Sequence, residues 1–257
     1  MITCAHDPLI QMDPVERRQI IEYLEEEKLP EKPTDEVRLM KEFVSSALSI
    51  NQPPHRIRNR LRSILGEISR YNTIDLCLYK LFGDPDFRVE NNWMPHSLAQ
   101  TANRLQKQIL KEDSFKKNVL TTIESIALTM QRELSSGLDR FYDHMSDELS
   151  HGPEQTWTFL KHFTSNISGV GPVLMSDFLK NIGFVEFAKI DQRLKTEFPK
   201  LASGLPTTPD KIFIYIWHLC KKMKMSPFVF DYILYQWGNH DLNPLYEKKF
   251  KSWPAAG

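Results

Sequence analysis

The chain has 257 residues, and its 33 Lys and Arg balance 33 Asp and Glu, so the formal net charge is zero. Hydrophobic residues make up 41% and charged residues 26% of the chain, which is typical of a soluble globular protein with a sizeable core. No run of about 18 or more apolar residues occurs, so the sequence predicts no membrane span.

Cysteine and histidine usage argues against several kinds of site. The cysteines are Cys4, Cys77 and Cys220, an odd number at wide spacing, which disfavours a disulfide framework and favours a reducing compartment, cytoplasmic or nuclear. The eight histidines form no zinc-binding pattern, so we expect no metal and no cofactor. The N-terminal residues lack the basic and apolar regions of a secretory signal.

The balanced charge is unevenly distributed along the chain. Acidic residues are in excess up to residue 150, and basic residues are in excess after it. Within the acidic part, the stretch 56–70 is basic and carries Arg56, Arg58, Arg60 and Arg62. These features are compatible with a polyanionic partner, and equally with ordinary solvated side chains.

Helical patterns fill nearly the whole chain. Asp13 and Pro14, followed by Glu16, form a typical N-terminal capping pattern, and Thr34 is expected to cap the next helix. The predicted helices cover about 15–27, 35–50, 55–70, 73–82, 96–111, 114–135, 137–149, 153–165, 172–183, 191–198, 210–224 and 226–237. Because no alternating strand pattern accompanies them, the predicted class is all-α.

A glycine-rich turn separates two of these helices. Gly169, Val170 and Gly171 are followed by Pro172, which favours the first turn of a helix. A tight turn leading into a helix N-terminus leaves backbone N–H groups pointing outward, and such groups favour a phosphate. The same turn is also explained by an ordinary corner between two packed helices, in which glycine permits close contact.

The helix after the turn is divided by face. A broad apolar side faces the core, and a second side carries Val173, Asp177, Lys180 and Asn181. Asp191 follows shortly afterwards, where it can cap the next helix or take part in chemistry.

These segments resemble the helix-hairpin-helix DNA glycosylases, the superfamily of endonuclease III. The turn, the helix with Phe178-Leu179-Lys180-Asn181-Ile182-Gly183-Phe184, and Asp191 are similar in register to archaeal-type 8-oxoguanine DNA glycosylases. The segment 224–238, with Asp231 and Trp237, resembles a late helix of that family, and 43–57 is weakly similar to an early one.

The resemblance implies one unit over 1–257, in which two helical lobes enclose a central cleft. The hairpin and the catalytic-type segment would occupy 153–198. The implied partner is double-stranded DNA with a damaged base, bound by a monomer. Residues 169–171 and Lys180 would bind DNA, and Asp191 would be catalytic. The cleft or base pocket would include Asn51, Gln52, Val173, Asp177, Asp231 and Trp237.

One position departs from the family pattern. Many members carry a nucleophilic lysine where this chain has Val173, and valine cannot attack the sugar. The resemblance therefore implies a monofunctional glycosylase, which hydrolyses the N-glycosidic bond of a flipped base with Asp191 and has no lyase activity. A non-catalytic DNA-binding protein and a protein-interaction module remain alternatives. Trp217, Phe228, Phe230 and Tyr232 fit either a base pocket or the core.

Overall fold

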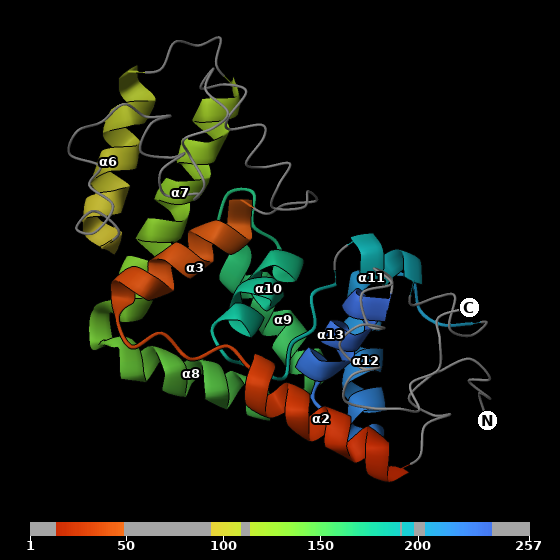
Figure 1. Cartoon of the computed structure of the whole chain (residues 1–257). Helices are drawn as coiled ribbons and strands as arrows, with labels where there is room; N and C mark the ends of the chain where they lie inside the picture. The colour runs from red at the N-terminus through yellow and green to blue at the C-terminus, as the bar shows by residue number, and fades with distance from the viewer. Residues whose placement is uncertain (1–13, 49–93, 109–113, 191, 198–203, 238–257) are drawn as a thin grey trace, which may run out of the picture. The chain divides into compact units, whose positions relative to one another are not determined.

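The computed structural model describes residues 14–48, 94–108, 114–190, 192–197 and 204–237, and these are helical without a strand (Figure 1). The all-α prediction is confirmed for these residues. The helices are α2 (Pro14–Lys28), α3 (Glu36–Leu48), α6 (Pro95–Gln108), α7 (Ser114–Glu133), α8 (Leu138–Ser150), α9 (Pro153–Thr164), α10 (Pro172–Asn181), α11 (Gln192–Glu197), α12 (Pro209–Met223) and α13 (Pro227–Trp237), with a short 3-10 turn η1 (Leu134–Ser136). The helices predicted over 55–70 and 73–82 lie outside the described residues.

The chain divides into two compact units. Unit 1 comprises Met1–Glu31 and Leu179–Gly257, and unit 2 comprises Lys32–Phe178. The boundary falls within α10, so this one helix begins in unit 2 and ends in unit 1. Among the described helices, none has the length and apolar character needed to cross a lipid bilayer.

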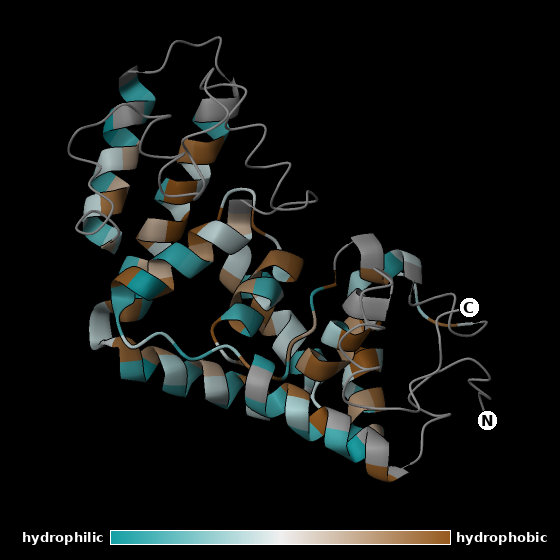
Figure 2. Cartoon of the chain, in the orientation of Figure 1, coloured by the Kyte–Doolittle hydropathy of each residue, from teal (hydrophilic) through white to brown (hydrophobic). Residues whose placement is uncertain are grey.

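Unit 2 is built around α7. This helix packs along α6 and against α3, and α8 packs on α9. Figure 2 shows hydrophobic and polar residues alternating along α7, as expected of a helix with one buried face. The rings of Phe43 on α3 and Phe178 on α10 stack with centroids 4.1 Å apart at the centre of this core. The buried residues of α7 are Val119, Leu120, Ile123, Ile126, Ala127 and Met130.

Unit 1 is built around α13, which packs against α2, α11 and α12. Its helix α12 ends at Lys224, which adopts a left-handed conformation at φ 54° and donates its N–H to the last carbonyls. The core of this unit includes Phe187, Ile190, Ile212, Ile216, Val229 and Phe230.

One predicted cap is wrong by a residue. Thr34 was expected to cap the helix that follows it, but α3 begins at Glu36 and the Asp35 carboxylate accepts the Arg38 N–H at 2.8 Å. Asp35 is therefore the N-cap. A carboxylate serves here at least as well as a hydroxyl, because it also interacts favourably with the positive end of the helix dipole.

Tyr142 attaches the start of unit 2 to α8. Its hydroxyl donates a hydrogen bond of 2.8 Å to the Pro33 carbonyl, and the Lys32 ammonium lies 5.4 Å from the ring centroid. Burial raises the pKa of Tyr142 to about 12, with Arg38 opposing the shift and Asp35 adding to it.

Replacing Tyr142 with Phe should lower the free energy of unfolding by about 1 kcal/mol, because the buried Pro33 carbonyl loses its donor. The folded state favours the neutral phenol. Its contribution is therefore present below the unfolded pKa of 10.0 and is lost as the pH rises toward about 12. Denaturant titrations of both proteins at pH 7 and above pH 10 measure this difference. Equal midpoints at pH 7 would contradict the prediction.

Candidate phosphate-binding hairpin

The predicted hairpin forms as helix, turn and helix. After α9, the Ile167 N–H donates to the Thr164 carbonyl at 3.0 Å and the Val170 N–H donates to the Ile167 carbonyl at 3.2 Å. The Gly171 carbonyl then accepts the N–H groups of Leu174 and Met175, each at 3.0 Å, which starts α10. The side chains of Ile167 and Val170 are buried and fix the turn to the core of unit 2.

The turn lies against α7. The Ser168 N–H donates to the Ser125 hydroxyl at 3.0 Å. Gly169 has φ +73°, and a Cβ at this position would lie only 3.0 Å from Thr122 Oγ1. Glycine is therefore favoured at 169 for two reasons: the backbone conformation is unfavourable for other residues, and a Cβ would make the Thr122 side chain shift.

Gly171 differs from Gly169 in both respects. Its φ lies outside the left-handed region, and a Cβ at this position would have no heavy atom within 4 Å. Within the part of the chain that the structure describes, the N–H groups of Gly169, Gly171 and Val173 have no hydrogen-bond acceptor. These three unused donors lie in the turn and at the N-terminus of α10, with open space beside Gly171. Unused N–H groups at a helix N-terminus favour an anion such as phosphate.

The set of donors differs from the one predicted. The amides of 169–171 were expected to act together, but the Val170 N–H is used inside the turn. The Val173 N–H takes its place, because the first residues of a helix have no carbonyl one turn earlier to bond. Val173 itself is half-buried, and Asp177, one turn later on the same face, is buried.

Lys180, which is predicted to bind DNA, forms an ion pair within unit 1. Its ammonium pairs with the Asp231 carboxylate at 2.7 Å, and the two side chains are only 15% and 13% exposed. The same Asp231 oxygen also accepts the Lys189 N–H at 3.1 Å. The physical reason is that an ammonium removed from water needs a carboxylate partner. Asp231, which is predicted to line a base pocket, connects α13 to α10 and to the segment before Asp191.

The other predicted site residues fall in parts of the chain that the structure does not describe. Asn51, Gln52, Asp191 and the arginines of 56–62 lie outside the described residues, as does the side chain of Trp237. Of the aromatic candidates for a base pocket, Phe228 and Phe230 are buried in the core of unit 1.

Other chemically capable groups in the described residues are poor candidates. Cys220 is buried in α12, and burial raises the pKa of its thiol far above the usual range, so it is not a nucleophile. Within the described ranges, no three His, Cys, Asp or Glu side chains cluster as a metal ion would need.

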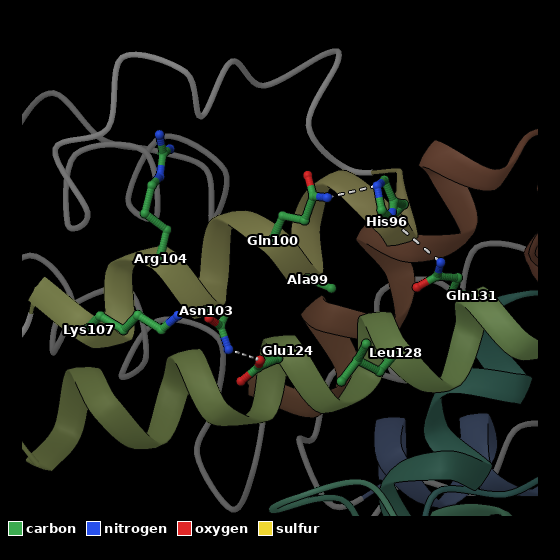
Figure 3. Close-up of a pocket in the computed structure, with 9 residues that line it drawn as sticks. All are labelled: His96, Ala99, Gln100, Asn103, Arg104, Lys107, Glu124, Leu128 and Gln131. Carbon is green, nitrogen blue, oxygen red and sulfur yellow. Dashed lines mark hydrogen bonds between the residues drawn. The ribbon is translucent and has the colours of Figure 1, made fainter.

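Open grooves lie along α7 among the described residues of unit 2. The first, of about 610 Å³, lies along α6 and α7 and contains Glu124, whose carboxylate accepts hydrogen bonds from Asn103 and Gln106 at 2.7 Å each. Figure 3 shows Asn103 and Glu124 directed toward each other between the two helices, whereas Arg104 points away. A carboxylate in this position disfavours an anionic ligand. A second groove, of about 790 Å³, includes Asn166 of the hairpin turn, and none of its described lining residues is a carboxylate.

Comparisons of the chain with protein-family models, curated proteins and solved structures give no match. The sequence resemblance and the hairpin geometry are therefore what bear on function.

Replacing Lys180 with Met should lower the free energy of unfolding of unit 1 by about 3 kcal/mol, because Asp231 keeps its charge in a largely buried position. The double variant with Asp231→Asn should recover much of this loss, since asparagine still offers an oxygen to the Lys189 N–H. Chemical denaturation followed by circular dichroism measures both. Lys222→Met, at an exposed position on α12, is the matched control. A Lys180→Met protein as stable as this control would show that the pair is unimportant.

Proposed function

We propose that this protein binds duplex DNA through the backbone amides of its hairpin. The observation that carries the proposal is the set of available N–H donors at Gly169, Gly171 and Val173, with open space beside Gly171. Backbone donors hold a phosphate without reading a base, so binding through them depends on the shape of the backbone and not on the sequence. The resemblance to helix-hairpin-helix DNA glycosylases favours DNA over other phosphate-bearing ligands.

The proposed activity is monofunctional DNA N-glycosylase, on a two-lobed fold with a cleft between the lobes. A damaged base would be flipped out of the duplex into this cleft. The bond between the base nitrogen and the sugar C1′ breaks, and its electron pair leaves with the base. The Asp191 carboxylate would stabilise the positive charge that develops on the sugar and orient the water that adds to C1′. That water gives up one proton, and the departing base takes one up. The products are a free base and an abasic site.

Val173 excludes a Schiff-base mechanism at this position. Without an amine at this position, no Schiff base forms between Val173 and the sugar, so strand cleavage is not coupled to base removal. The same valine favours the second candidate, a protein that binds DNA on this fold without catalysis. Excision of a base separates the two candidates.

Replacing Gly171 with Val should reduce affinity for duplex DNA about tenfold while the fold is retained. A Cβ at this position meets no heavy atom within 4 Å, and the valine side chain would occupy the side from which a phosphate approaches. Fluorescence anisotropy with a labelled duplex measures affinity, and circular dichroism confirms folding. Ser165→Val, at an exposed residue on the α9 side of the turn, is the control. Unchanged affinity in a folded Gly171→Val protein would rule out the hairpin as a phosphate site.

Replacing Asp191 with Asn should reduce base excision by about 100-fold or more and leave DNA affinity nearly unchanged. Asparagine keeps the shape of the side chain but not the negative charge that a cationic transition state needs. Duplexes with single lesions, scored for abasic sites with and without alkaline cleavage, give the rate.

Borohydride should trap no covalent adduct with the unmodified protein. Efficient trapping would show that a lysine acts as nucleophile and would overturn the monofunctional assignment. If no lesion is excised while DNA binding persists, the non-catalytic candidate is correct.

A further inference from the structure

The second groove of unit 2 continues from the hairpin along α7. It has a volume of about 790 Å³ and an open form. Its lining residues are of polar type apart from Leu128 and Arg132, although the apolar parts of these side chains supply most of the lining surface. Among the described residues, no carboxylate contributes to it. The lining residues are Ser125, Leu128, Thr129, Gln131, Arg132, Ser135 and Asn166.

The groove begins where the hairpin rests on α7. Ser125 accepts the Ser168 N–H of the turn and also lines the groove, and Asn166 contributes from the turn itself. From Ser125 to Arg132 the helix advances seven residues, or about 10 Å, and returns to the same face after two turns. A duplex strand advances about 3.4 Å per nucleotide, so this length corresponds to about three nucleotides of one strand.

Arg132 supplies the positive charge of this groove. Its side chain is exposed, and one guanidinium nitrogen lies 3.5 Å from the hydroxyl of the buried Thr129. Among the described residues, no carboxylate lies within ion-pair distance of it. The neighbouring Glu133 instead lies near His144, at 3.7 Å. Arg132 therefore differs from Lys180, whose charge is neutralised inside unit 1.

We propose that the groove holds the sugar-phosphate backbone of the DNA strand whose phosphate is bound at the hairpin, with Arg132 on a second phosphate. This rests on the proposed DNA binding and extends it to a second contact on the same strand. Arg132 provides the charge and Asn166 a neutral amide donor. The half-exposed Leu128 offers an apolar surface for the sugar. A single small anion would leave most of the groove unfilled, whereas a length of backbone fits its extent.

The test is the salt dependence of duplex binding. Loss of one phosphate contact should make the slope of log K against log salt less steep by about 0.9, because one fewer counterion is released. At about 0.1 M salt, the loss of this one counterion-release contribution corresponds to about eightfold weaker binding of the duplex. We expect both changes for Arg132→Gln. Arg132→Lys should keep the slope, because the point charge remains.

The matched control is Arg140→Gln, which removes the same charge from an exposed position of α8 that does not line the groove. If Arg132→Gln changes slope and affinity no more than Arg140→Gln does, the groove is not a phosphate site. The outcome separates this proposal from the broader one: an effect of Gly171→Val with none of Arg132→Gln leaves hairpin binding intact and removes the groove. Absence of any duplex binding by the unmodified protein removes both.

Discussion

The position of the hairpin turn on α7 determines which backbone groups of the turn remain available. Ser168 is held by the Ser125 hydroxyl, Val170 bonds within the turn, and the absence of a Cβ lets Gly169 lie against Thr122 without moving it. These contacts use the N–H groups of Ser168 and Val170, and they fix the backbone that carries the N–H groups of Gly169 and Gly171. The N–H groups at 169, 171 and 173 are thus oriented before any ligand arrives, and a ligand does not need to order them.

Unit 1 uses a different kind of contact to hold its chain in place. The segment 184–190 is tied to α13 at two points: the Phe228 N–H donates to the Val185 carbonyl at 3.0 Å, and Asp231 accepts the Lys189 N–H. Lys180 neutralises the carboxylate that makes the second contact. The segment 184–190 has no helix of its own, and these two contacts with α13 hold it in place just before Asp191.

The all-α class and most helix positions could be predicted from the sequence, because prolines, capping residues and apolar spacing are local signals. The hairpin could be predicted for the same reason. The pairing of Lys180 with Asp231 could not, although both residues were singled out, because they are 51 positions apart and only packing brings them together. The groove beside the hairpin was missed because its residues lie on α7, where Ser125, Thr129 and Arg132 look like ordinary polar positions. Their 3.6-residue periodicity indicated a shared face of the helix, but nothing in the sequence indicated that the hairpin lies against that face.

The buried thiol of Cys220 has a consequence for how the two units behave in solution. Its side chain is 1% exposed within α12, so a thiol reagent can reach it only when unit 1 opens. In a protein with Cys4 and Cys77 replaced by serine, the rate of modification at this position would therefore measure the opening of unit 1 alone. Comparing this rate with the rate at which the whole chain unfolds would show whether unit 1 opens on its own or only together with unit 2.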